Sequence, residues 1–157
     1  MTLSARLLLS TLLILTGPSC AIALTAAPGD TLILTVVNRS DHTLTYKNIT
    51  GTKPGNFFSL TSNDILPGAS VTIRATSAHW AGIAGNITFV DDKGQKNILK
   101  IHDPVQIGAN RHPASFVMQS PRLVSFVPNF RMNRDTHPLS LAWTRATVEI
   151  QNRAGLI

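Results

Sequence analysis

The sequence is poor in cysteine: Cys20 is the only one in 157 residues. It lies inside a segment, Met1 to Ala23, that has the pattern of an export signal. We therefore expect the mature chain, which begins at Leu24, to contain no disulfide bond. A chain of that length can bury a core without covalent staples. An exported protein without cysteine fits a bacterial envelope or culture medium better than a small eukaryotic secreted module.

Long apolar runs are also absent. A membrane-spanning helix needs roughly 20 apolar residues, and no run of that length occurs here. The longest apolar stretch, Leu7 to Leu15, follows the positive charge of Arg6 and precedes the helix-breaking pair Gly17 and Pro18. Ala21-Ile22-Ala23 then offers the small-x-small pattern of a signal peptidase site. This arrangement predicts a cleavable signal peptide over 1–23 and an exported protein.

Cys20 allows an alternative in which the protein is a lipoprotein with an acylated first residue. Such sites carry a large aliphatic residue three positions before the cysteine and small residues between. Those positions hold Gly17, Pro18 and Ser19, of which only Ser19 fits well. Cleavage after Ala23 is the favoured hypothesis.

Acidic residues are few, with 8 Asp and Glu against 14 Lys and Arg. Loss of Arg6 with the signal leaves 13 Lys and Arg against 8 Asp and Glu, a net charge of +5. Most of the late excess comes from arginine, and four of these residues form the candidate basic patch: Arg111, Arg122, Arg131 and Arg134. A basic surface attracts anionic lipid, anionic glycan, nucleic acid or acidic protein. Export argues against nucleic acid, and a solvated surface that maintains solubility is the plain alternative.

No stretch of the mature chain shows the 3.6-residue apolar stripe of a helix, whereas short β-branched and alternating segments are frequent. Strands are predicted over 31–38, 44–49, 57–60, 71–75, 85–90, 96–101, 115–118, 123–127 and 139–150. Pro67-Gly68 suits the centre of a type II turn, and Asp91-Asp92-Lys93-Gly94 indicates a hairpin. Pro128 is expected to end a strand. Many short strands with turn signals predict an all-β fold, a single antiparallel β-sandwich domain over 24–157.

Catalytic motifs are missing as well. The five histidines show no metal-ligand spacing, and neighbours on a strand, such as His102 and Asp103, point to opposite faces. Asp91 and Asp92 are better explained as hairpin residues than as calcium ligands. No Gly-x-Ser-x-Gly elbow occurs. We expect no catalytic residue, metal or cofactor and therefore no enzyme, with a hydrolase of unrecognised site as the alternative.

Aromatic residues make up only 6% of the chain, so their positions are informative. Trp80 lies among small residues in a predicted loop, where it could enter a lipid headgroup interface or instead cap the core. Phe57 and Phe58 cannot both face the core of one strand, which predicts that one is exposed. Trp143 lies in an alternating strand with Leu139 and Leu141 on its face and is expected in the core. Trp80, Phe57 and Phe58 are the candidate contact residues.

The order of several phrases resembles the aegerolysins over about residues 29–150. The phrases are Val37-Asn38-Arg39-Ser40, Leu44-Thr45, Ile65-Leu66-Pro67-Gly68-Ala69-Ser70, Ala84-Gly85-Asn86-Ile87-Thr88-Phe89, Ile101-His102-Asp103-Pro104 and Gly108-Ala109-Asn110. The resemblance implies a small secreted β-sandwich, related in shape to actinoporin-like haemolysins, that recognises membrane lipid and sometimes recruits a larger pore-forming protein. This chain departs from the family in being basic, in having few Trp and Tyr residues, and in having His102 where an aromatic usually precedes Asp-Pro.

These observations lead to one hypothesis and one alternative. The hypothesis is an exported, non-enzymatic β-sandwich, secreted or retained in the periplasm or cell envelope, that binds a membrane lipid or cell-surface component. The alternative is a periplasmic or envelope structural subunit of a larger protein assembly, such as a secretion apparatus, which would use exposed strand edges and basic charge to meet its partners.

Overall fold

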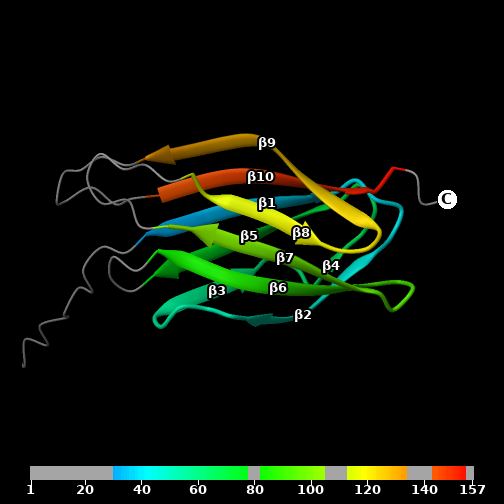
Figure 1. Cartoon of the computed structure of the whole chain (residues 1–157), viewed down its shortest axis with the longest axis horizontal. Helices are drawn as coiled ribbons and strands as arrows, with labels where there is room; N and C mark the ends of the chain where they lie inside the picture. The colour runs from blue at the N-terminus through cyan, green and yellow to red at the C-terminus, as the bar shows by residue number, and fades with distance from the viewer. Residues whose placement is uncertain (1–29, 78–81, 105–112, 134–142, 155–157) are drawn as a thin grey trace, which may run out of the picture.

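Ten strands form two five-stranded sheets in the computed structural model, which describes residues 30–77, 82–104, 113–133 and 143–154 (Figure 1). Sheet A has the order β3 (Asn56–Leu60), β5 (Ser70–Ser77), β1 (Thr31–Asn38), β10 (Trp143–Asn152), β9 (Leu123–Asn133). Sheet B has the order β4 (Asp64–Ile65), β2 (Leu44–Thr50), β6 (Ile83–Asp91), β7 (Lys96–Asp103), β8 (Ser115–Gln119). The predicted all-β sandwich is confirmed. The predicted signal, residues 1–23, lies outside the described residues.

One strand pairing differs from the purely antiparallel sheets that we expected. β1 and β10 run parallel, with Thr31 opposite Trp143 and Asn38 opposite Ile150. The other described pairings are antiparallel. A parallel pair cannot be joined by a tight hairpin, and here almost the whole chain separates the two strands.

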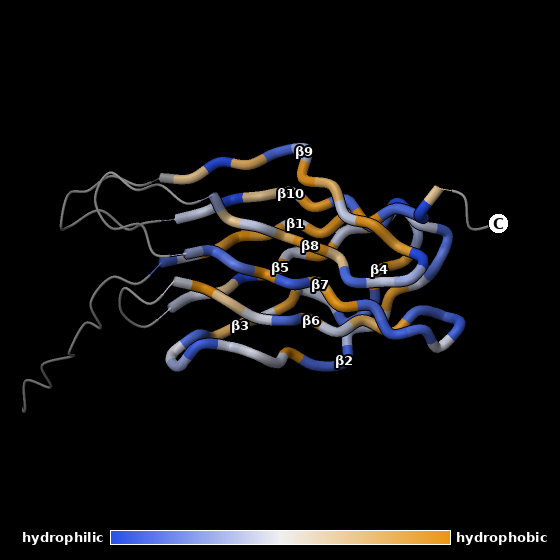
Figure 2. The backbone as a smooth tube through the Cα atoms, in the orientation of Figure 1, coloured by the Kyte–Doolittle hydropathy of each residue, from blue (hydrophilic) through white to orange (hydrophobic). Residues whose placement is uncertain are grey.

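The core between the sheets follows from strict alternation along the strands. On β1 every second residue is buried, and Leu32, Leu34 and Val36 are all 0% exposed. Sheet B contributes Phe89, the largest fully buried side chain. Each such side chain contributes about 1.5–3 kcal/mol of burial free energy. Figure 2 shows hydrophobic residues alternating along the strands, and hydrophilic residues at the turn between β6 and β7.

Pro128 does not end its strand, which corrects the sequence prediction. β9 continues through it to Asn133. Phe126 lies opposite Glu149 and Asn129 opposite Thr147, so a bulge of two residues, one of them Pro128, faces Val148. β9 is an edge strand, and proline is tolerated at edges and bulges because no ladder hydrogen bond is lost there.

Two predicted turns have the expected geometry. Gly68 has φ +79°, and the Ala69 amide donates to the Leu66 carbonyl at 2.9 Å, as in a type II turn over Pro67-Gly68. In the β6–β7 hairpin the Gly94 amide donates to the Asp91 carbonyl at 2.9 Å. Sequence patterning did not predict β4, because a two-residue strand has no periodicity to detect.

Side chains also join the two sheets. Ser125 of β9 accepts a hydrogen bond from the Met118 amide at 2.9 Å and donates to the Phe116 carbonyl at 3.2 Å, so it ties β9 to β8. On the other side of the sandwich, Phe58 of β3 packs inward over Gly85 of β6, where a Cβ would lie only 3.0 Å from the Phe58 ring. These contacts fix which face of sheet A points to solvent.

Candidate functional site

The two phenylalanines of β3 point in opposite directions. Phe58 packs against the core, whereas the Phe57 side chain is 70% exposed on the outer face of sheet A, the face directed away from sheet B. One exposed and one packed phenylalanine is what the sequence predicted. Three other candidates, Trp80, Arg111 and Arg134, lie outside the described residues.

Trp143 is not a core residue, which corrects the expectation from its strand pattern. On β10 the buried positions are Thr144, Ala146, Val148 and Ile150, so the tryptophan is in phase with the outward residues. It is half-buried, and the guanidinium carbon of Arg145 lies 5.0 Å from its ring centroid. The apolar residues Leu139 and Leu141, which suggested a buried face, lie outside the described chain.

The two described members of the candidate basic patch, Arg122 and Arg131, lie near opposite ends of β9. Strands rise about 3.3 Å per residue, so the two Cα atoms are on the order of 30 Å apart. They therefore belong to different surfaces. Arg131 lies on the outer face of sheet A, and Arg122 lies in the β8–β9 turn.

Strand register places Arg131 in a row of arginines that runs across sheet A. Arg131 is directly opposite Arg145, Arg145 is opposite Ile33, and Ile33 is opposite Arg74. All three arginines are exposed. Neighbouring strands are about 4.8 Å apart, so Arg74 lies about 10 Å from Arg145 across β1. We call Arg74, Arg145 and Arg131 the arginine row.

The arginine row lacks acidic partners within the part of the chain that the structure describes. The nearby outer-face carboxylate, Glu149, is 3.3 Å from the Arg39 guanidinium and is paired with it. None of the three row arginines forms an ion pair with a described residue. Like charges directly opposite one another across a ladder destabilise a sheet. An unpaired arginine pair at this register is therefore a candidate site for an external anion.

A shallow groove of about 320 Å³ passes beside the arginine row. Its lining residues are Ile33, Thr35, Asn129, Phe130, Arg131, Arg145, Ala146 and Thr147. Thr35 lies opposite Thr147, and Thr147 opposite Asn129, so a row of polar side chains lies next to the arginines. Hydroxyl and amide groups there can hydrogen-bond a ligand that the guanidinium groups attract.

On the other side of the arginine row lie the aromatic residues. Phe57 is opposite Thr76, Thr76 is opposite Thr31, and Thr31 is opposite Trp143. The exposed Phe57 ring and the half-buried Trp143 ring thus belong to one row, two residues along the strands from the arginines. The outer face of sheet A combines cations, hydroxyls and aromatic rings.

Only Phe57 and Arg131 of this face were candidates from the sequence. Arg74 carries no local signal, and Arg145 belongs to the excess of late arginine but was not among the candidate patch residues. Only the β5–β1–β10 register aligns them. Trp143 was predicted to lie in the core because Leu139 and Leu141 are in phase with it. Arg145 and Glu149 are in phase with it as well, and they indicate the outer face.

The candidate acid–base and metal residues are placed as structural residues. His102 is exposed and Asp103 is buried, on opposite faces of β7 as expected for neighbours in a strand. Asp91 accepts the amides of Lys93 and Gln95 at 3.0 and 2.8 Å within its hairpin. Over the described ranges, no group of three or more His, Cys, Asp or Glu side chains is arranged to hold a metal ion. No helix in those ranges is long and apolar enough to span a membrane.

Comparison with known proteins supports the fold. No protein-family model and no curated protein matches the chain. Among solved structures, the aegerolysin-like protein RahU, crystallised in complex with a TRIS molecule, matches with a TM-score of 0.50 at 16% identity, over 76% of this chain and 94% of RahU. IP-1A from Alcaligenes faecalis matches with a TM-score of 0.46 at 10% identity, over 82% of this chain and 95% of IP-1A. The likeness to RahU supports the aegerolysin resemblance at the level of the fold.

Proposed function

We propose that this protein is an exported, non-enzymatic binding module that attaches through the outer face of sheet A to membranes carrying anionic headgroups. The observation that carries the proposal is the arginine row, three exposed guanidinium groups in register across β5, β10 and β9 that form no ion pair with a described residue. The export of the chain rests on the signal pattern over 1–23.

The chemistry of the row suits phosphate. A guanidinium group presents a planar fork of N–H donors that matches two oxygens of one phosphate. Arg131 and Arg145 are directly opposite, with Cβ atoms about 5 Å apart, so both can approach a single headgroup. Arg74, about 10 Å away, would meet a neighbouring headgroup. Each basic residue near an anionic membrane contributes about 1 kcal/mol to binding.

The aromatic row supports the same orientation. A half-buried Trp ring is favoured at the headgroup level, where its apolar body and N–H group both find partners. Phe57, which is 70% exposed, lies in the same row three strands away, on β3, and offers apolar area to the upper acyl region. The fold shared with the aegerolysin-like RahU agrees with a surface-binding module but assigns no ligand.

Vesicle binding tests the proposal when charges are removed from the outer face of sheet A in one variant and from the outer face of sheet B in another. Arg131→Gln with Arg145→Gln should weaken binding to phosphatidylglycerol-containing vesicles about 25-fold, since each charge is worth about fivefold. The matched control is Lys96→Gln with Lys100→Gln, which removes the same charge from the exposed face of sheet B. Co-sedimentation measures both. Equal losses in the two double variants, or no binding of the unchanged protein, would refute the proposed face.

Phe57→Ala tests the apolar contribution separately. The substitution should weaken vesicle binding several-fold, and this loss should persist at high salt, because apolar insertion is not screened as charge attraction is. The exchange of an exposed ring should leave thermal unfolding unchanged within error. Trp143 fluorescence on vesicle addition gives an independent readout. If the Phe57→Ala variant bound vesicles as strongly as the unchanged protein at every salt concentration, Phe57 would not contact the membrane.

A second candidate function has one observation in its favour. The edge strand β9 exposes Phe126, Val127 and Phe130, at 52%, 41% and 36%. An edge with apolar side chains is a surface on which a partner protein can add a strand. For a subunit of an envelope assembly, chemical cross-linking in envelope fractions should capture stable partners through β9, whereas a membrane-binding module should need none.

A further inference from the structure

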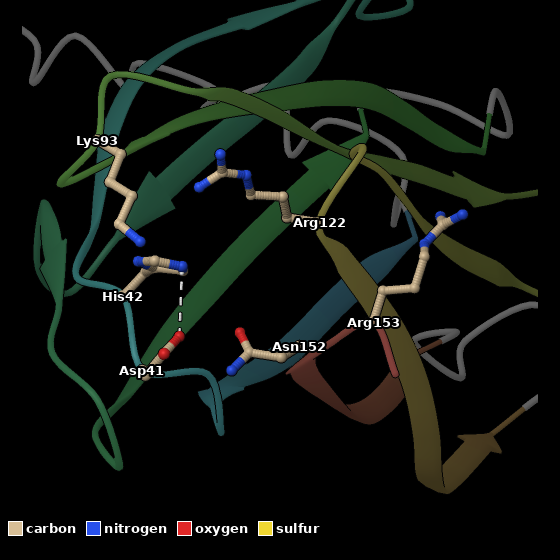
Figure 3. Close-up of a pocket in the computed structure, with 6 residues that line it drawn as sticks. All are labelled: Asp41, His42, Lys93, Arg122, Asn152 and Arg153. Atoms are coloured by element: carbon tan, nitrogen blue, oxygen red, sulfur yellow. Dashed lines mark ion pairs between the residues drawn. The ribbon is translucent and has the colours of Figure 1, made fainter. Parts of the chain in front are cut away.

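A second cationic cluster lies at the end of the sandwich where the β1–β2, β6–β7 and β8–β9 turns meet. Lys93 comes from the β6–β7 turn, Arg122 from the β8–β9 turn, and Arg153 directly follows β10. With Asp41, His42 and Asn152 they line a cavity of about 150 Å³ (Figure 3). We call this the turn pocket.

Hydrogen bonds of side chains and backbone hold the segments of the turn pocket in place. Asn97, which is 0% exposed, accepts a hydrogen bond from the Ser120 hydroxyl at 2.5 Å and donates to the Gln95 carbonyl at 2.9 Å. The same Ser120 hydroxyl accepts the Leu123 amide at 2.9 Å. The β6–β7 turn, which carries Lys93, is thereby fixed against the β8–β9 turn.

The chain after β10 is fixed in the same way. The Arg153 amide donates to the Arg122 carbonyl at 2.7 Å, and the Arg153 guanidinium donates to the Ser120 carbonyl at 3.2 Å. Figure 3 shows the Arg153 side chain turned away from Asp41, whereas Lys93 and Arg122 extend toward His42. Lys93 and Arg122 are therefore the two cations that a ligand in the turn pocket would meet directly.

The carboxylates near the turn pocket already have partners. His42 Nδ1 lies 2.8 Å from Asp92 Oδ1, and His42 Nε2 lies 3.3 Å from Asp41 Oδ1. A hydrogen bond from Asn152 lowers the pKa of Asp41, which stays ionised. Neither Lys93 nor Arg122 has a described carboxylate within ion-pair distance. The two side chains thus line one cavity without an ion pair to a described carboxylate, although the Lys93 charge also contributes to the lowered pKa of Asp41.

We propose that the turn pocket binds a small phosphate-type anion, inorganic phosphate or the phosphate of a monoester. Arg122 would supply a bidentate fork, and Lys93 a compact ammonium charge for a further oxygen. The Arg153 charge adds to the local positive field. The hydrogen bonds of Asn97 and Ser120 set the relative positions of the two turns that carry Lys93 and Arg122.

The turn pocket is independent of the proposed membrane-binding face. Arg122 and the arginine row are at opposite ends of β9, on the order of 30 Å apart along the strand. The same phosphate chemistry occurs free in solution and in lipid headgroups. The titrations below therefore use both inorganic phosphate and vesicles that contain a phosphate headgroup.

Titration of the isotope-labelled full chain with inorganic phosphate tests the site, with sodium chloride added to keep ionic strength constant. We expect saturable amide shifts at 93–95, 122–123 and 153. Arg122→Gln and Lys93→Gln should each weaken binding about tenfold or more, as expected for the loss of one charge-assisted hydrogen bond. Arg122→Lys should retain part of the affinity. Both glutamine substitutions are at exposed turn positions, so the fold should persist.

Lys100→Gln removes one charge from the exposed face of sheet B, outside both proposed sites, and is the matched control that should leave phosphate binding unchanged. Non-saturating shifts, or an equal loss in this control, would overturn the turn pocket. A second titration uses vesicles of phosphatidic acid in phosphatidylcholine. Shifts at the same amides that require Arg122 identify a headgroup as the source, and their absence identifies a soluble phosphate. Either result supports the phosphate site.

Discussion

Phe89→Ala should lower the free energy of unfolding by about 3–5 kcal/mol, the usual cost of truncating a fully buried phenylalanine. Phe89 is 0% exposed at the centre of β6, where it lies in register with Tyr46 and Asn97. Its removal forfeits apolar burial and leaves a cavity between the sheets that the strand backbones cannot close. Equilibrium urea unfolding followed by tryptophan fluorescence measures the change.

Two further variants make this result diagnostic. Phe89→Leu keeps most of the volume and should cost less than about 1.5 kcal/mol. Phe57→Ala, the same chemical change at a side chain that is 70% exposed, should stay within about 0.5 kcal/mol of the parent. Similar losses of unfolding free energy for Phe57→Ala and Phe89→Ala would contradict the burial of Phe89 between the sheets and the exposure of Phe57 on the outer face of sheet A.

Asn38→Ala should cost about 2–4 kcal/mol although it removes only one polar group. Asn38 is 0% exposed at the end of β1. Its side-chain amide donates to the carbonyls of His42 and Ile65 at 2.7 and 2.8 Å, and its side-chain oxygen accepts the Ser40 hydroxyl at 2.6 Å. Alanine would leave these buried groups without partners, and unpaired buried carbonyls are costly.

Because Asn38 organises the turn that carries Asp41 and His42, its loss should also increase hydrogen exchange at the His42 amide. Asn63→Ala is the control, since Asn63 is exposed and its side chain makes no hydrogen bond with the described residues. That substitution should change stability by less than about 0.5 kcal/mol. A matching loss at Asn38 and Asn63 would show that the side-chain network of Asn38 contributes nothing.

Local sequence patterns predicted the strands well where period and turn chemistry agreed. The segment 31–38 is rich in β-branched residues and ends at the turn-like residues 38–41, and β1 has those bounds. Pro67-Gly68 and the Asp91–Gly94 hairpin followed from φ requirements that only a few residues satisfy. Pro128 was misinterpreted, because whether a proline breaks a strand depends on whether the strand is at an edge.

The candidate sites were predictable only in part. Phe57 and Arg131 have sequence signals, namely a phenylalanine pair in one strand and an excess of late arginine. Arg145 shares the excess of late arginine, but only strand register aligns it with Arg74, since β1 lies between their strands. The turn pocket depends on the buried Asn97 and the half-buried Ser120, two polar residues whose pairing across 23 positions no sequence pattern indicates.

By itself, the sequence determined the all-β class, most strand positions and the tight turns, because period-two alternation and backbone preferences act within a few residues. The tertiary structure decided which strands are neighbours, that β1 and β10 run parallel, and which charges share a surface. Those properties depend on hydrogen-bond register between segments that are distant in the chain. Lys93 and Arg122 meet in one pocket while Arg122 and Arg131 separate, for the same reason: a turn brings strand ends together, and an extended strand keeps its ends apart.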